Sequence, residues 1–226
     1  MSTEPTTTSY ALLGLLATQS FTAYDLTQQM RRGLRWAWPR SEANLYNEAK
    51  RLVRLGWAKG IKQRQGQRTR TRYEITDTGR EALAGWLGEP PAALPQFESE
   101  TMLRVFFADH GDASDLRATV EQTRRQLRDV AVDVLPVLEG YEAGDVPFPG
   151  RMHLVLLYVD FIARFYSEVS DWLDAVDAEA ATWDSTVGVG MTPSARRRLD
   201  HALEFWRGVA VSGGGSGSAT TRKADG

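Results

Sequence analysis

Hydrophobic positions near the start of the chain recur with helical spacing. Residues 9–18 (SYALLGLLAT) predict a first helix that is capped near Ser9. In the following segment, FTAYDLTQQM, Thr22 precedes Asp25 by three residues, which resembles a capping box. The pattern therefore predicts a second helix that begins at Thr22 and turns Leu26 and Met30 inward.

A third helix is predicted after Pro39, which ends any earlier helix, because Ser41 is a good N-cap. Gly56 is a plausible C-terminal stop for this helix. Apolar residues recur through it at steps that place them on one buried face: Leu45, Ala49, Leu52 and Val53.

Two alternating segments follow, at residues 57–63 and 68–75, and predict a β-hairpin around Gly66. Thr76 or Asp77 could then cap a further helix, DTGREALAGWL. The predicted order is three helices, a hairpin and a fourth helix.

The segment GEPPAALPQ, residues 88–96, is rich in proline and is the predicted domain boundary. Almost everything after it has helical periodicity.

A heptad seam is formed by Leu116, Val120, Thr123, Leu127, Val130 and Val134. A second stripe consists of Leu154, Leu157, Phe161, Phe165, Val169, Trp172 and Val176. Thr192 and Pro193 predict the start of a last helix, and the Gly/Ser-rich tail after it is expected to be disordered.

The sequence thus predicts a mainly α protein with a small β-hairpin. Its expected parts are residues 1–88, residues 97–211 and a disordered tail, 212–226. The seam in the second part could be plain core or dimer packing. Of these two alternatives, dimer packing is favoured.

Charge divides the chain in the same way. Residues 1–80 carry 14 Lys and Arg against 6 Asp and Glu, whereas residues 81–226 carry 13 against 23. This asymmetry suggests a basic module that meets a polyanion. The absence of cysteine excludes disulfides, and no segment resembles a secretory signal or a membrane span, so a cytoplasmic protein is expected.

The third helix carries a polar stripe opposite Leu45 and Leu52. It comprises Arg40, Asn44, Asn47, Arg51 and Arg54, with Ser41 and Lys50 beside it. Arg and Asn can read base edges bidentately in a major groove, and a helix N-terminus can hold a phosphate. The alternative is an ordinary solvated helix face.

The hairpin favours the DNA-binding interpretation, because residues 62–72 (KQRQGQRTRTR) contain basic residues and no acidic one. Strand periodicity places Arg68, Arg70 and Arg72 on one face, where they should act together, while Thr69 and Thr71 face the helices. A helix-turn-helix followed by a basic hairpin is the winged-helix arrangement, whose wing contacts phosphates or the minor groove.

These residues also carry a family resemblance. The LY-x(3)-KRL-x(3)-G pattern that begins at Leu45, and the R-Y-x-I-T-x-x-G run that begins at Arg72, resemble the PadR family of bacterial transcription regulators. The resemblance implies a winged helix-turn-helix, a C-terminal helical dimerisation domain, a homodimer, and repression relieved by a small ligand. It also implies that Tyr46 lies at the DNA surface. Two positions depart from the pattern: Asn47 replaces a usual proline, and Ala49 replaces a frequent leucine.

Aromatic residues suggest an effector site, although most of them are expected to be helical core. The candidates for binding a small aromatic effector are Trp36, Trp38, Phe106, Phe161 and Phe165. No catalytic motif is present, and no cofactor or metal is expected. The sequence therefore predicts a homodimeric regulator of double-stranded DNA with a palindromic operator. The alternative is a winged-helix adaptor that binds protein.

Overall fold

The computed structural model describes residues 4–65 and 68–212, and of Gln65, Arg68 and Thr69 it describes the backbone only. It is mostly helical, with one antiparallel sheet in the order β1-β3-β2, which confirms the predicted fold class. Contacts divide the chain into two compact units. One comprises Met1–Phe97 with Ala143–Phe165, and the other comprises Glu98–Glu142 with Tyr166–Gly226.

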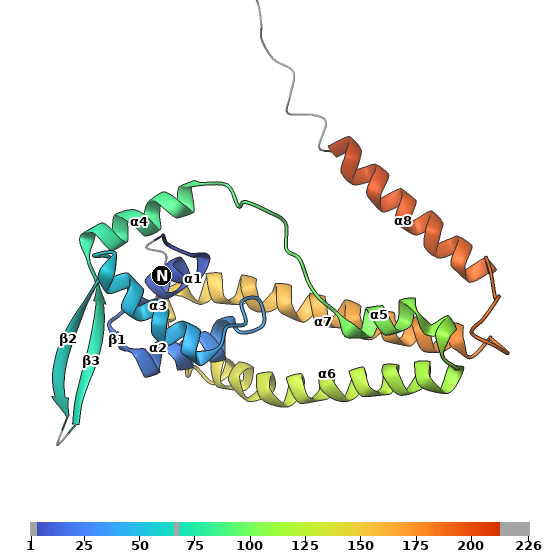
Figure 1. Ribbon diagram of the computed structural model, residues 1–226, viewed down its shortest axis with the longest axis horizontal. Coiled ribbons are helices and arrows are strands. Elements are labelled where there is room, and N and C mark those ends of the chain that lie inside the picture. The colour runs from blue at the N-terminus through green and yellow to red at the C-terminus, as the bar shows by residue number, and fades with distance from the viewer. Residues whose placement is uncertain (1–3, 66–67, 213–226) are drawn as a thin grey trace, which may run out of the picture. The chain divides into compact units, whose positions relative to one another are not determined.

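The first unit begins with four helices whose caps are mostly visible in the sequence (Figure 1). They are α1 (Thr7–Leu16), α2 (Ala23–Gln29) with a π-helical turn (Met30–Leu34), α3 (Glu42–Arg54) and α4 (Asp77–Gly88). The capping box of Thr22 and Asp25 and the Ser41 cap are confirmed. The first helix begins earlier than expected, because Thr6 caps α1 and exchanges hydrogen bonds with Ser9.

The wing is formed by β2 (Ala58–Gln65) and β3 (Arg68–Ile75), which project as a long hairpin in Figure 1. The sequence did not predict the third strand, β1 (Phe21–Thr22). It pairs with β3 so that Phe21 faces Tyr73 and Thr22 faces Arg72. The sheet therefore connects the base of the wing directly to the start of α2.

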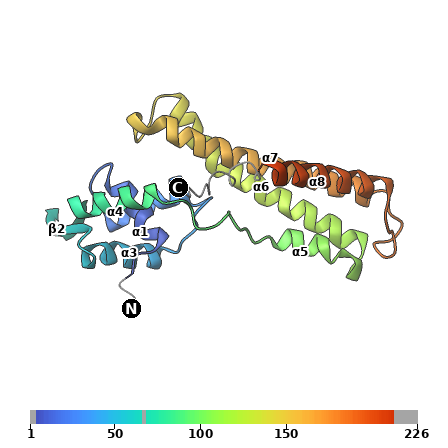
Figure 2. The ribbon, with the colours of Figure 1, turned by 90° about the horizontal axis from the view of Figure 1, so that it is seen from above.

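One hydrophobic core holds this unit together. It is built by Leu12, Leu13, Leu15, Leu16, Phe21, Leu26, Met30, Leu45, Ala49, Leu52, Ala58 and Tyr73. Burial of Tyr73 raises the pKa of its phenol. The core confirms the inward face predicted for the third helix, except that Val53 is 40% exposed. Figure 2 shows α4 beside α1, where Trp86 stacks on Tyr10 with a centroid distance of 5.0 Å.

The second unit is helical and has a smaller core. Its elements are α5 (Glu100–Phe106), a 3-10 turn (Ala108–His110), α6 (Ala113–Glu142), the later part of α7 (Met152–Ala180) and α8 (Pro193–Ser212). A further 3-10 turn (Pro149–Arg151) precedes α7 and belongs to the first unit. Among the described residues, none of the helices has both the length and the apolar character that crossing a membrane requires.

The predicted heptad seam of α6 is buried to different degrees along its length. Leu116 and Val120 are buried against Leu173 and Val176 of α7 in the same chain. For these two residues the expected dimer packing is wrong, because an intrachain partner already covers them. The remaining seam positions are only partly buried.

The predicted parts 1–88 and 97–211 were divided at the proline-rich connector, and their roles in DNA binding and dimerisation stay predictions. Helix α4 ends at Gly88 and α5 begins at Glu100, so the proline-rich connector lies between helices. The predicted disordered tail begins at Ser212, the last residue of α8, and its remaining residues lie outside the described part of the chain.

Candidate nucleic-acid interface

Helix α3 is fixed to the core through one side only. Leu45, Ala49 and Leu52 are buried, and the Ser41 hydroxyl accepts the Asn44 N–H at 3.3 Å. Because successive residues of a helix are rotated by 100°, the direction opposite Leu45 and Leu52 belongs to Asn47, Lys50 and Arg54. All three side chains are exposed, and Asn44 is exposed at the edge of this face. The structure thus presents an open polar face of four predicted site residues.

Arg51 was predicted to belong to the same stripe, but it lies at the border of the open face. Its side chain is only 19% exposed, and its Nε lies 3.8 Å from a carboxylate oxygen of Glu48. Its guanidinium also donates to the carbonyl oxygen of Glu4 at 3.2 Å. Partial burial and these contacts distinguish Arg51 from the exposed residues of the stripe, and its DNA-binding role stays a prediction.

The start of α3 carries two further predicted site residues, Arg40 and Ser41, both of which are exposed. The Arg40 guanidinium lies over the Trp38 ring at 4.1 Å and donates to the carbonyl oxygen of Pro39 at 2.6 Å. Tyr46, on the side of α3 next to Val53, is half-buried. Their contacts with DNA stay predictions.

Glu48 is a residue that the sequence analysis missed. It is only 4% exposed, and it accepts hydrogen bonds from the Ser9 hydroxyl and, at 3.1 Å, from the Thr6 hydroxyl. These partners belong to the cap of α1, where the helix dipole favours a negative charge. The position of Glu48 between Leu45 and Leu52 in the sequence could have indicated its role, because a carboxylate on a buried stripe requires hydrogen-bond partners. Glu48 therefore fixes α3 to the start of α1.

The wing offers a second basic surface. Lys62, Arg64 and Arg70 are exposed along its two strands. Arg72 differs, because it is half-buried and donates two hydrogen bonds to Ser20. The expectation that the wing arginines share one environment is therefore wrong for Arg72. The side chains of Arg68 and Thr69 lie outside the described part.

The base of the wing is locked to the end of α3. Gly56 stops α3 with a φ of 72°, as predicted, and its carbonyl oxygen accepts the Thr76 hydroxyl at 2.7 Å. The Thr76 N–H donates to the Trp57 carbonyl oxygen at 3.0 Å, and Thr76 also caps α4. Thr71 lies beside Gly60, close to Val53 of α3, in agreement with its predicted direction. These contacts join the base of the wing to the end of α3.

Arginines before α3 were also missed as candidates, although they follow one another closely in the sequence. Arg31 and Arg32, in the π-helical turn, are exposed, and Arg31 pairs with Glu42 at 2.8 Å. The pairing neutralises the one acidic side chain in the first turn of α3. The segment of the chain that precedes α3 is therefore basic.

The predicted effector residues do not form one site within either unit. Trp36 lies under the Arg35 guanidinium at 4.0 Å, and the Trp38 indole donates to the Thr8 hydroxyl at 3.0 Å. Phe161 is 58% exposed and Phe165 is 39% exposed. Phe106 belongs to the second unit and packs edge-on against its neighbour, Phe107. An effector-binding role for these residues stays a prediction.

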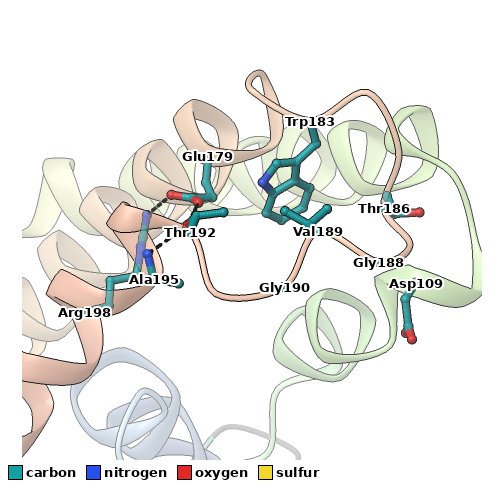
Figure 3. Close-up of a pocket in the computed structure, with 10 residues that line it drawn as sticks. All are labelled: Asp109, Glu179, Trp183, Thr186, Gly188, Val189, Gly190, Thr192, Ala195 and Arg198. Atoms are coloured by element: carbon teal, nitrogen blue, oxygen red, sulfur yellow. Dashed lines mark hydrogen bonds and ion pairs between the residues drawn. The ribbon is translucent and has the colours of Figure 1, made fainter.

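The second unit contains a shallow pocket of about 440 Å³ where the end of α7 and the start of α8 are joined by a loop (Figure 3). Glu179 bridges the two helices, because it accepts the Thr192 hydroxyl at 2.9 Å and Arg198 at 3.2 Å. Hydrogen bonds from Ser194, Thr192 and Arg198 lower the pKa of its carboxyl group. None of the predicted effector residues lines this pocket.

Comparisons with known proteins agree with this geometry. Residues 12–85 match the model of the Transcriptional regulator PadR-like family. The negative transcriptional regulator PadR of Bacillus subtilis is 26% identical over 172 residues, which cover 74% of this chain and 93% of that protein. The crystal structure of B. subtilis PadR in complex with operator DNA is similar with a TM-score of 0.66 and 21% identity, and the match covers 78% of this chain and 99% of that chain.

A second structure of the same relative, B. subtilis PadR in complex with p-coumaric acid, has a TM-score of 0.59 and 21% identity and covers 76% of this chain and 98% of that chain. The matched residues contain α3 and the wing, so the family resemblance inferred from the sequence is confirmed. Residues 12–85, which hold α3 and the wing, match the PadR-like family of transcriptional regulators.

Proposed function

We propose that the protein binds duplex DNA sequence-specifically, with α3 in the major groove and the wing on the phosphate backbone. The observation that supports this most directly is the open face of α3, where Asn47, Lys50 and Arg54 are exposed while the opposite side is core. Asn can pair with adenine, and Arg with guanine or phosphate. B. subtilis PadR, which has the same fold, has been crystallised with operator DNA.

The charge distribution also supports DNA binding. Around α3 and the wing, the acidic residues are paired: Glu42 with Arg31, and Glu74 with Lys59 at 3.2 Å. Arg64 and Arg70 are both exposed on the wing. An excess of exposed cations on one surface attracts a polyanion and releases its counterions on binding.

The wing contribution is tested by replacing Arg64 and Arg70 with alanine. We expect weaker binding to all duplexes, and a plot of log K against log salt whose slope is smaller by about 0.9 for each phosphate that the variant no longer neutralises. The preferred sequence should not change, because phosphate contacts carry no sequence information. Fluorescence anisotropy at several salt concentrations measures both quantities.

The matched control is Arg128→Ala, which removes a positive charge from α6 of the second unit, where Arg128 pairs with Glu121. It should leave affinity and slope unchanged. If the wing variant retained wild-type affinity and salt slope, the wing would not contact DNA.

We propose that the protein is a homodimer. Helix α8 is exposed from Arg196 to its end, including large apolar side chains at Leu199, Leu203, Phe205, Trp206, Val209 and Val211. Contiguous apolar surface of this kind marks a protein interface. A homodimer would bind two half-sites, so the operator should be palindromic.

We further propose that a small aromatic molecule releases the DNA, so that the protein acts as a repressor. The support is that B. subtilis PadR, a negative regulator, has been crystallised with p-coumaric acid. Candidate contacts are Phe161 and Phe165, which are exposed, together with Trp36 and Trp38 beside α3.

Effector binding should quench the fluorescence of the 7 tryptophans and dissociate the DNA complex. A titration against a panel of aromatic acids measures the quenching, and anisotropy of labelled duplex measures the release. An aliphatic acid of similar charge is the control. If no aromatic acid changed either signal while DNA binding was intact, effector control of this kind would be wrong.

We infer that the protein acts by binding and not by catalysis. The family is one of transcriptional regulators, and the residues that carry the proposal are hydrogen-bonding and cationic groups on an exposed surface. Its proposed partner, duplex DNA, implies action in the cytoplasm of a bacterial cell.

A further inference from the structure

Two arginines on the same face of β3 have different surroundings. Arg70 is exposed, whereas Arg72, two residues later, is half-buried. The Arg72 Nε donates to the Ser20 hydroxyl oxygen at 2.6 Å, and its Nη2 donates to the Ser20 carbonyl oxygen at 2.6 Å. A planar guanidinium that bonds one residue through two nitrogens is fixed in direction as well as in distance.

The partner residue, Ser20, lies immediately before β1. Thr22, at the end of β1, faces Arg72 in the sheet and also accepts the Asp25 N–H at 3.2 Å as the cap of α2. Helix α2 packs on α3 through Leu26 in the common core. The Arg72–Ser20 contact therefore joins the wing to the helix that supports α3.

Apart from the Arg72–Ser20 contact, the short strand β1 is the main link on this side between the wing and α2. Strand β1 has two residues, and beyond them the wing continues as a two-stranded hairpin from Lys62 and Thr71 outward. An isolated two-stranded hairpin is only marginally stable, and a two-residue ladder constrains its direction weakly. A charge-assisted pair of hydrogen bonds adds substantially to such a short ladder.

We propose that Arg72 and Ser20 form a clamp that orients the wing relative to α3, so that Arg72 is a positioning residue and not a DNA contact. The proposal rests on the proposed function, since the wing that it positions is the proposed phosphate-binding element. Without the clamp, the wing must lose orientational freedom when DNA binds, which weakens affinity. The number of phosphates contacted, which sets the salt slope, stays the same.

Measurements of DNA affinity and its salt dependence distinguish a positioning role of Arg72 from a phosphate contact. Arg70→Met is the matched control. We expect Arg72→Met to weaken binding about 5- to 20-fold, and Ser20→Ala about 2- to 5-fold, both with the wild-type salt slope. Arg70→Met should instead lower the slope by about 0.9. The double variant Ser20→Ala/Arg72→Met should bind no more weakly than Arg72→Met alone, because both changes remove one interaction.

The opposite pattern would overturn the clamp. If Arg72→Met lowered the salt slope as Arg70→Met does, and Ser20→Ala had no effect, Arg72 would be a phosphate contact. Circular dichroism of each variant ensures that only folded protein is compared. If Arg72→Met did not fold, Ser20→Ala alone would decide, because it removes no charge and keeps the bond to the carbonyl oxygen.

A second measurement in the free protein does not depend on DNA. The chain has no cysteine, so spin labels can be placed at Lys62→Cys in the wing and Ala43→Cys in α3 without background. Lys62 pairs with Thr71, so strand alternation places its label on the face away from Arg72. Dilution with unlabelled chain isolates the distance within one protomer.

Pulsed electron paramagnetic resonance should give one narrow label distance in the parent and in Arg70→Met, and a clearly broadened distribution in Arg72→Met. Ser20→Ala should broaden it less. An unchanged distribution in Arg72→Met would contradict the clamp whether or not DNA binds. Broadening in Arg72→Met together with a parent that binds no duplex would refute the proposed function and leave the clamp intact.

Discussion

Replacing Asn47, Lys50 and Arg54 together with alanine is expected to abolish specific DNA binding, with affinity for the preferred duplex reduced at least about 100-fold. The three side chains are exposed on the open face of α3. One good bidentate base contact is worth about 1–3 kcal/mol of discrimination, and each phosphate contact adds to affinity. The fold should survive, because alanine is the best helix former and no core residue changes.

Anisotropy titrations with the preferred duplex and a scrambled duplex measure this effect. The control replaces Thr78, Arg80 and Glu81 with alanine, because these residues are exposed on α4 of the same unit. That variant should bind like the parent protein. If the folded α3 variant bound the preferred duplex within about twofold of the parent, α3 would not be the reading helix.

Gly79→Ala is expected to destabilise the first unit by about 3 kcal/mol or more. A Cβ at Gly79 would lie 2.1 Å from the Trp57 carbonyl oxygen, which is a backbone atom that cannot rotate away. The same oxygen accepts the Thr76 N–H at 3.0 Å, so a shift of this peptide also weakens the cap of α4. The position therefore requires glycine through close approach of two backbones.

Gly85→Ala, in the same helix, is the matched control, because nothing lies within 4 Å of a Cβ placed there. It should stabilise the protein by roughly 0.5–1 kcal/mol, because alanine favours a helix more than glycine does. Urea denaturation followed by circular dichroism compares the two midpoints. Equal stability of Gly79→Ala and the parent would show that α4 does not meet the α3–wing connection in this way.

Local chemistry explains which parts of the fold were predictable from sequence. The cap of α2 at Thr22, the cap of α3 at Ser41 and the stop at Gly56 each depend on side chains or backbone angles within a few residues. Strand β1 was not predictable, because its two residues are extended only through pairing with β3. Nothing in the sequence near Phe21 signals a partner about 50 residues away.

In the candidate site, too, contacts between segments that are distant in the sequence could not be predicted. Periodicity correctly placed Arg70 and Arg72 on one face of a strand, but it could not show that Ser20 captures Arg72. In α3, steps of four and three grouped Arg51 with Asn47. The structure instead brings Arg51 toward Glu48 and Glu4. Periodicity predicts the direction of a side chain and not the segment that meets it.

The second unit illustrates a further limit. An apolar seam has the same pattern whether its partner belongs to the same chain or to another. Leu116 and Val120 pack within the chain, whereas Leu203 and Trp206 of α8 remain exposed. Only the three-dimensional arrangement separates surface already covered from surface still available for a second protomer.

Selection of bound sequences from a library of random duplexes tests sequence-specific DNA binding most directly. The full chain at low salt should enrich one palindromic sequence, with half-site centres one helical turn of about 10–10.5 base pairs apart or a multiple of it. The Asn47, Lys50 and Arg54 alanine variant should show no such enrichment. Recovery of a library no different from the starting pool by the folded wild-type protein would contradict the proposed function and favour a winged-helix adaptor that binds protein.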